Sequence, residues 1–308
     1  MRIGLIMQLN GRMDDNGRAA PTWDDIRAQV SNAESVGFDS AVFEDGLFYP
    51  GEGGDSGLWE AVAISGAIAE ATSTIEFGPS VFNGVYRSPA MLAKIAETID
   101  EISGGRFIFG IGAGNTPDED YQTFGFPTDF RYSRFEEAIE IIHSMLKNGQ
   151  ADHQGRFWSA NKAEMVIRGP RSEGPPIVVA AGKPRMIRLA ARFGDEWNWW
   201  AHGEARIESV KPIIEELELA CGEVGRDPVT LRRSLDIYSV DPLGIGFDPD
   251  AHMVQIGGST GEVADALLEF AEVGVGEVRC DLVYEGDIEN KIQAIEAMAD
   301  VVQTLHDA

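Results

Sequence analysis

Residues 75–111, IEFGPSVFNGVYRSPAMLAKIAETIDEISGGRFIFGI, contain a strand, a helix and a second strand in succession. Ile75–Val81 and Arg106–Ile111 are short apolar runs of the kind that form buried strands. Between them, Pro89–Ile102 repeats apolar residues at helical spacing, with Pro in the first turn. This order predicts two parallel strands joined by a helical crossover. The helix face predicted to be buried consists of Leu92, Ile95, Ala96, Ile99 and Ile102.

The same alternation extends along the whole chain. Strands are predicted at Ile3–Met7, Phe38–Phe43, Ile75–Val81, Arg106–Ile111, Ile177–Ala181, Glu196–Trp199, Leu231–Val240 and Val278–Val283. Helices are predicted at Asp24–Val36, Leu58–Ala71, Pro89–Ile102, Phe135–Leu146, Met186–Phe193, Ile207–Val224, Val263–Val273 and Ile288–Leu305. Eight strand–helix repeats predict a (β/α)8 TIM barrel, an α/β fold. A doubly wound open sheet is the alternative, because a count of repeats does not show closure.

Three long connections interrupt this rhythm. Inserted loops are expected after strand four (Gly112–Arg134), between helix four and strand five (Lys147–Pro176), and after strand seven (Asp241–Gly261). Connections of this length are commonly lids or binding loops. No low-complexity tract or linker separates the repeats, so residues 1–308 are predicted to form a single domain.

The composition and charge of the chain argue against several classes of function. The 308 residues include 51 acidic and 25 basic ones, for a net charge of -26. This charge argues against a nucleic-acid binder and against attachment to an anionic membrane surface. No apolar run is long enough to span a membrane. Two cysteines, Cys221 and Cys280, are too few for a disulfide framework, which predicts a cytoplasmic location.

Two glycine motifs invite functional interpretations. Gly110-Ile-Gly-Ala-Gly114 follows a strand, but Asn115 breaks the dinucleotide fingerprint, and the acidic residues Asp118, Glu119 and Asp120 would repel a pyrophosphate. The glycines instead indicate close backbone approach, either to a ligand or within the loop itself. Gly257–Gly261 matches the G-x-S-x-G of hydrolases. A capping box formed by Ser259 and Glu262 is the favoured interpretation, and a triad of Ser259, Asp281 and His306 is the alternative.

No transition-metal site is predicted, because the five histidines never stand three or four residues apart. Residues 118–120 would suit Mg²⁺, but a solvated acidic loop is the favoured interpretation. The most unusual cluster is Trp197-Asn198-Trp199-Trp200, at the end of the sixth strand. Neighbouring side chains on a strand point to opposite sides, so at least one indole is expected in the core. The cluster nevertheless favours a site that stacks on a ring system, with the three indoles walling a substrate pocket.

Several ordered blocks resemble one family, the bacterial luciferase-like flavin and deazaflavin oxidoreductases. The most specific block is Ile102–Phe107 with Gly110–Asn115. The other blocks are Ala33–Ser40, Tyr86–Pro89 with Leu92–Lys94, Gly155–Trp158, Pro175–Ile177 and Arg188–Asn198. The resemblance implies a TIM barrel, commonly a homodimer, with FMN or coenzyme F420 bound at the carboxyl ends of the strands. The blocks at residues 86–89, 112–115 and 175–197 most resemble the F420 branch.

The resemblance also implies roles for individual residues. Ser80–Val81 occupies the place of a peptide bond, often cis, that bulges behind the central flavin ring. Ala180, Ala181, Gly182 and Lys183 occupy the place of the contacts to the coenzyme phosphate, which suits backbone N–H groups at a helix start. The remaining coenzyme or substrate contacts expected from the resemblance are Met7, with Gln8 beside it, Asn83, Asn115 and Asn198.

The chain departs from the family where the second strand ends. An acidic residue followed by His is typical there, whereas this chain has Glu44-Asp45-Gly46. Without an imidazole, proton transfer is predicted to fall to Glu44 or Asp45, to water, or to an unidentified group. The predicted function is F420-dependent hydride transfer to or from a small organic substrate. An FMN-dependent monooxygenase is the first alternative, and a non-catalytic flavin-binding protein is the second.

Overall fold

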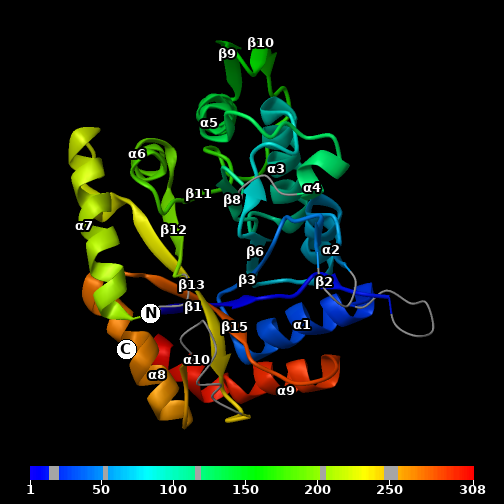
Figure 1. Cartoon of the computed structure of the whole chain (residues 1–308), viewed down its shortest axis with the longest axis vertical. Coiled ribbons are helices and arrows are strands. Elements are labelled where there is room, and N and C mark those ends of the chain that lie inside the picture. Colours follow the sequence, from blue (N-terminus) through cyan, green and yellow to red (C-terminus); the bar gives the residue numbers. More distant parts are fainter. Residues whose placement is uncertain (14–20, 51–54, 115–118, 202–205, 246–255) are drawn as a thin grey trace.

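The barrel closes through its third strand. The computed structural model describes residues 1–13, 21–50, 55–114, 119–201, 206–245 and 256–308. Figure 1 shows the strands surrounded by helices. The barrel strands are β1 (Arg2–Ile6), β3 (Ser40–Phe43), β6 (Glu76–Pro79) with β7 (Phe82–Asn83), β8 (Phe109–Gly112), β11 (Ile177–Ala180), β12 (Glu196–Trp200), β13 (Arg232–Asp241) and β15 (Glu277–Leu282).

Neighbours in the sheet follow the order β6-β3-β1-β15-β13-β12-β11-β8-β7, and all these pairs are parallel. Because β6 and β7 are two pieces of the third strand, the path returns to its starting strand. The Phe77 N–H donates to the Arg106 carbonyl at 3.1 Å, and the Ile108 N–H donates to the Phe77 carbonyl at 2.8 Å, so β6 also joins the segment that leads into β8. The predicted TIM-barrel fold is confirmed, and the open-sheet alternative is wrong.

Helices follow the strands, as the sequence predicts. They are α1 (Trp23–Val36), α2 (Ala61–Ala71), α3 (Pro89–Ser103), α5 (Arg131–Asn148), α6 (Pro184–Phe193), α7 (Ile207–Glu223), α8 (Thr260–Leu268), α9 (Ile288–Ala297) and α10 (Ala299–Asp307). Local chemistry sets their ends: Thr22 and Asp25 form a capping box on α1, and Gly37 ends that helix with φ of 100°. In the described part of the chain, no helix is long and apolar enough to cross a membrane.

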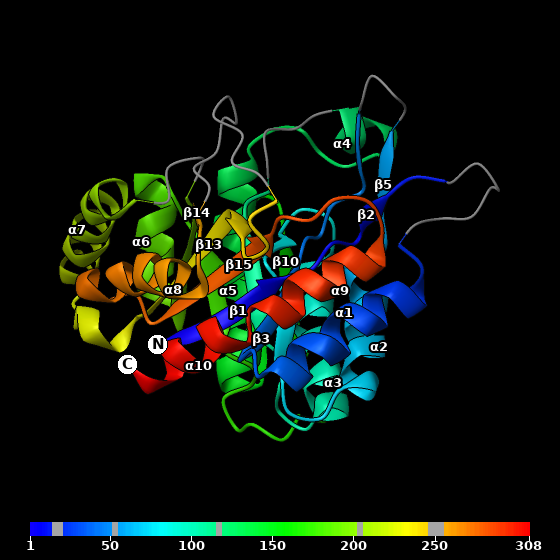
Figure 2. The ribbon, with the colours of Figure 1, turned by 90° about the horizontal axis from the view of Figure 1, so that it is seen from below.

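The connections hold short elements that the sequence patterns did not predict. The first two strand–helix connections form a small antiparallel sheet of β2 (Asn10–Gly11), β4 (Phe48–Tyr49) and β5 (Ser56–Leu58). The connection after β8 contains α4 (Glu119–Thr123), and that after α5 contains the hairpin of β9 (Gln150–Gln154) and β10 (Ser159–Glu164). The remaining elements are β14 (Ile256–Gly257) and the 3-10 turns η1 (Pro228–Thr230) and η2 (Glu269–Val273). Figure 2 shows α4 and β5 together above the barrel, away from both termini.

Some predicted boundaries are wrong. Leu58 belongs to β5 instead of α2, because it pairs with Asn10. The predicted final helix is two helices separated at Met298: α9 packs against α1, whereas α10 packs against β1 and α8. The predicted helix Val263–Val273 ends at Leu268 and continues as η2. Ile102, predicted to be buried, is 49% exposed in the last turn of α3.

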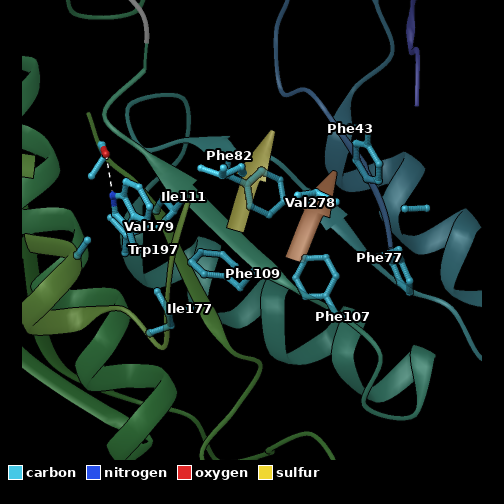
Figure 3. Packing of buried hydrophobic residues seen from close by; sticks show 14 of the residues in the cluster. Phe43, Phe77, Phe82, Phe107, Phe109, Ile111, Ile177, Val179, Trp197 and Val278 are labelled. Atoms are coloured by element: carbon cyan, nitrogen blue, oxygen red, sulfur yellow. Dashed lines mark hydrogen bonds between the residues drawn. The ribbon is translucent and has the colours of Figure 1, made fainter. Parts of the chain in front are cut away.

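Strand alternation divides the barrel into an apolar outer layer and a polar interior. Figure 3 shows residues of the outer layer, including Phe43, Ile177, Val179, Trp197 and Val278. The other side chains of the same strands point inward, and they contact one another across the barrel. Ser40 on β3 donates a hydrogen bond of 2.5 Å to Glu277 on β15. Arg279 on β15 donates one of 2.6 Å to Glu196 on β12. The interior beneath the strand ends is therefore a buried network of charges.

Candidate active site

A cavity of about 510 Å³ opens at the carboxyl ends of the barrel strands. Its walls come from the residues after β3, from the junction of β6 and β7, from the end of β8, from the last residues of β11 and β12, and from the middle of β13. This volume lies within the range of small-molecule and cofactor sites. Active sites of TIM barrels lie on this face, so the cavity is the candidate active site.

The peptide bond between Ser80 and Val81 is cis, as the resemblance predicts. Both residues line the cavity, between β6 and β7. Strand β8 passes close behind them because it carries glycines. A Cβ on Gly110 would lie 2.1 Å from the Pro79 carbonyl oxygen, and one on Gly112 would lie 2.8 Å from Val81 Cγ2. Gly110 and Gly112 therefore permit close packing of β8 against the bulge of the third strand.

Asp236 holds this bulge from across the barrel. Its carboxylate accepts hydrogen bonds from Ser80 Oγ at 2.7 Å and from Asn198 Nδ2 at 2.8 Å. Burial raises the pKa of Asp236, while the charge of Arg279 and both hydrogen bonds oppose that rise. The network fixes Ser80 and Asn198 on the cavity wall, where both were predicted.

Asp45 is buried and fully engaged by neighbouring residues. It accepts a bidentate pair of hydrogen bonds from Arg87, at 2.6 and 2.9 Å, and a third of 2.9 Å from the Asn83 N–H. Burial raises the pKa of Asp45, and the Arg87 contacts oppose the rise. Burial also lowers the pKa of Arg87, but its contacts with Asp45 and Glu60 outweigh this effect and raise it. Asp45 thus anchors Arg87 and the chain at Asn83, and Asn83 itself lines the cavity.

Glu44 is half-buried and lines the cavity beside two phenols. It accepts hydrogen bonds from Tyr49 at 2.6 Å and from Tyr238 at 3.5 Å. Burial raises the pKa of Tyr238, and the negative charge of Glu44 raises it further. At the neighbouring position, a Cβ on Gly46 would lie 3.1 Å from Leu58 Cδ2. Leu58 therefore occupies space that a His side chain at position 46 would need.

The loop after β11 is shaped by two indoles. Trp197 Nε1 donates to the Ala181 carbonyl at 2.8 Å, and a Cβ on Gly182 would lie 3.0 Å from Trp199 Nε1. Ala180 lines the cavity, and the exposed Lys183 is the N-cap residue of α6. The four residues predicted to contact phosphate are thus contiguous from the cavity wall to a helix start.

The prediction for the three indoles needs correction. Trp200 lines the cavity and is 39% exposed. Trp197 is fully buried, and neither it nor Trp199 belongs to the described cavity lining. The cause is the two-residue period of β12, which points Glu196, Asn198 and Trp200 inward and Trp197 and Trp199 toward the helices.

Two other residues predicted to contact the coenzyme or substrate, Met7 and Gln8, lie elsewhere than predicted. Met7 is buried in the hydrophobic core outside the described cavity lining, with its N–H donating to the Val42 carbonyl at 2.7 Å. The predicted floor residue beside it, Gln8, accepts a hydrogen bond from Tyr284. Asn115 and Asp118 lie outside the described residues.

The predicted hydrolase alternative receives no support from the geometry. Ser259 forms the expected capping box with Glu262 at the start of α8. Asp281 lies 3.7 Å from Lys291 Nζ, and His306 Nε2 lies 3.0 Å from Asp39. Ser259, Asp281 and His306 therefore have separate partners instead of forming a triad.

Sequence reasoning missed Asp236 and Tyr238, both on β13. A signal was present: Ser234, Asp236 and Tyr238 are polar residues at every second position of a run otherwise taken as a strand. Such alternation places them on one face of the strand. The interior of a TIM barrel is usually packed with branched apolar residues, so a polar inward column suggests a site above it.

Comparison with known proteins agrees with this geometry. Residues 1–239 match the family model of luciferase-like monooxygenases. The chain belongs to the luciferase-like monooxygenase family. A relative named 5,10-methylenetetrahydromethanopterin reductase, from Archaeoglobus fulgidus, is 36% identical over 171 residues, which are 56% of this chain and 47% of the relative. A relative named F420-dependent glucose-6-phosphate dehydrogenase, from Segniliparus rotundus, is 28% identical over 71% of this chain and 63% of its own length.

The chain thus matches about half to two thirds of the length of these curated relatives. Among solved structures, an F420-dependent secondary alcohol dehydrogenase superposes with a TM-score of 0.80 at 20% identity, covering 99% of this chain and 98% of that one. EDTA monooxygenase from Chelativorans also gives a TM-score of 0.80, at 15% identity, covering 99% of this chain and 93% of that one. These likenesses establish the barrel fold, and the relatives' names support the prediction that this luciferase-like protein is an enzyme.

Proposed function

We propose that this luciferase-like protein transfers hydride between coenzyme F420 and a small organic substrate. The observation that carries the proposal is the open cavity at the strand ends, whose wall includes Ser80 and Val81, packed against β8 and hydrogen-bonded to Asp236 from across the barrel. Relatives named as F420-dependent support F420 as the coenzyme. When bound, the coenzyme supplies a ring carbon that accepts or releases hydride.

The residues present suit a flat ring system. Gly112, Ala113 and Ala180 leave the cavity wall without large side chains at their positions. Ser80 and Asn198 supply polar atoms at the same wall, and Asp236 fixes both of them. These residues would hold the ring by shape and by a few hydrogen bonds, which is typical of cofactor sites.

The coenzyme phosphate is assigned to the loop that leads into α6. Ala181, Gly182 and Lys183 precede the helix, whose first N–H groups attract anions. Arg185 on the same helix is engaged with Glu136 and Ser133, whereas Lys183 is exposed. Lys183 is therefore the basic group that we assign to the phosphate.

Of the two carboxylates predicted to handle protons, we now favour Glu44. It lines the cavity, and its oxygens accept hydrogen bonds from the hydroxyls of Tyr49 and Tyr238. It can take a proton from a substrate hydroxyl or return one, with the phenols orienting its oxygens. Asp45 is a positioning residue in this proposal, because Arg87 and Asn83 already use its oxygens.

Two alternative functions predict different results in coenzyme binding and turnover. The fold likeness to EDTA monooxygenase supports an FMN-dependent monooxygenase, and Gly46 in place of His supports a non-catalytic flavin-binding protein. Titration of the purified protein with both coenzymes, followed by absorbance and fluorescence, separates them. We expect micromolar binding of F420. Binding of FMN without binding of F420 would overturn the proposal, and F420 binding without turnover on alcohols, ketones and imines would favour the non-catalytic protein.

We also propose a homodimer in a reducing compartment, the cytoplasm. Helix α2 is apolar on its outer side as well, where Ala63 is exposed and a Cβ on Gly66 would meet no atom within 4 Å. A second copy packing there would cover this face. Both cysteines are buried and free, which supports a reducing environment.

A further inference from the structure

We infer that the substrate side of the cavity selects a small organic cation, such as an alkylammonium group, over molecules that carry phosphate or carboxylate. The assignment of this side to substrate rests on the proposed function, because the coenzyme ring is placed against Ser80 and Val81. The substrate side is then formed by Glu44, Tyr49, Trp200 and Tyr238, all of which line the cavity.

The central observation is a carboxylate that lacks a cation. Glu44 is half-buried and accepts hydrogen bonds from two phenols, but within the described part of the chain it forms no ion pair. A carboxylate removed from bulk water is stabilised by a positive charge nearby. The cavity beside it is the place from which a ligand would supply that charge.

Aromatic residues line the same side of the cavity. The rings of Trp200 and Tyr238 lie 5.2 Å apart between centroids, at 56° to each other, and Tyr49 donates to Glu44 from another side. An alkylammonium group held by Glu44 would gain further attraction wherever it reaches the face of one of these rings. Such a group needs no hydrogen-bond donor from the protein, so the engagement of both phenols with Glu44 does not weaken the site.

Three basic side chains beneath and beside the cavity are already neutralised. Arg87 is paired with Asp45 and Glu60, Arg279 with Glu196 and Glu277, and Lys291 with Asp281. Of the described residues that line the cavity, none is Lys, Arg or His. A phosphate or carboxylate on the substrate would therefore lie beside Glu44, with no Lys, Arg or His among the described lining residues to balance it.

The net charge of the chain favours a cation as well. The whole chain carries a net charge of -26, which attracts cations and repels anions over a distance comparable to the Debye length. Long-range attraction and the local environment of Glu44 thus favour the same sign of charge.

The test uses three small probes of matched size and different charge on the full-length protein without coenzyme. The probes are choline, its neutral isostere 3,3-dimethyl-1-butanol, and inorganic phosphate, with binding followed by calorimetry. We expect choline to bind about tenfold more tightly than the isostere, and phosphate to show no binding that competes with choline. Equal binding of choline and its isostere, or competition by phosphate, would overturn the inference.

Two variants locate the effect. Glu44→Gln keeps the shape and removes the charge, so the preference for choline should fall toward one. Trp200→Leu keeps the charge and removes a ring, so choline should bind several-fold more weakly. The matched control is Glu296→Gln, which removes the same charge from an exposed position on α9. If Glu296→Gln lowers the preference as much as Glu44→Gln, the selectivity comes from net charge and the inference fails.

Failure of the inference and failure of the proposed function give different results. Choline binding is measured without coenzyme, and F420 binding is measured in a separate titration. A choline preference that depends on Glu44 in a protein that does not bind F420 would leave the cation site standing and remove the proposed function. F420 binding together with turnover of glucose 6-phosphate would leave the proposed function standing and remove the cation site.

Discussion

The hydroxyl of Ser80 donates a hydrogen bond of 2.7 Å to the carboxylate of Asp236, a residue 156 positions later in the chain. Ser80 belongs to the bulge of the third strand, and Asp236 belongs to the seventh strand, on another side of the barrel. Asn198 donates to the same carboxylate from the sixth strand. One buried side chain therefore sets the position of two residues on the cavity wall.

Asp236→Ala should weaken both stability and coenzyme binding. The substitution leaves Ser80 without its acceptor and Asn198 with Ser234 alone, and an unpaired buried polar group costs about 1–3 kcal/mol. Asp236→Asn is the matched variant, because its amide oxygen still accepts from one of the two donors. Urea unfolding and an F420 titration of both variants measure the effects. Wild-type unfolding free energy and wild-type affinity in Asp236→Ala would contradict this role.

Neighbouring indoles on β12 should respond differently to truncation. Trp197 is fully buried, and its N–H is bonded to the Ala181 carbonyl. Trp197→Ala is therefore expected to lower the unfolding free energy by about 3–5 kcal/mol, as for other large buried side chains. Trp200→Ala removes a side chain that is 39% exposed, so we expect a loss of about 1 kcal/mol or less. Thermal and urea unfolding would show it, and similar losses in both variants would contradict the assignment of opposite faces.

The different burial of these indoles shows how far the sequence alone predicted this part of the site. The strand containing them was predicted from its apolar run, and the two-residue period already indicated that one indole would be buried. Which indole lines the cavity depends on which face of the strand points into the barrel. That side is set by Asn198 meeting Asp236 of β13, a contact between residues far apart in the sequence. Local periodicity carries no information on such contacts.

Glu44 and Asp45 illustrate the same limit within the site. Both were predicted to handle protons because they follow the second strand. The sequence gives no reason to assign them different roles. Asp45 differs because Arg87, on the connection after the third strand, binds both of its oxygens. By contrast, the cis bond at Ser80–Val81 was predicted correctly, because it follows from the resemblance of whole blocks to one family.

Lys183→Glu should weaken coenzyme binding without loss of stability. Lys183 is exposed at the start of α6, and charge reversal there would repel the coenzyme phosphate. We expect F420 affinity to fall more than tenfold if the phosphate lies within hydrogen-bonding reach. Lys211→Glu makes the same change in charge at an exposed position on α7 and should leave affinity near wild type. Unchanged affinity in Lys183→Glu would place the phosphate elsewhere.

Acid should destabilise the protein in part through Glu34. One oxygen of this carboxylate accepts hydrogen bonds from the N–H groups of Ser73, Thr74 and Ile75, just before β6. Burial raises the pKa of Glu34, but these donors outweigh it and lower the pKa from 4.5 to about 2. The folded state therefore favours the ionised form: the contribution is complete above pH 4.5 and is lost as the pH falls toward 2. Glu34→Gln should be less stable than wild type at pH 7, and the gap should narrow between pH 4.5 and 2 in urea unfolding. A gap that stays constant across this range would show that the charge of Glu34 does not stabilise the start of the third strand.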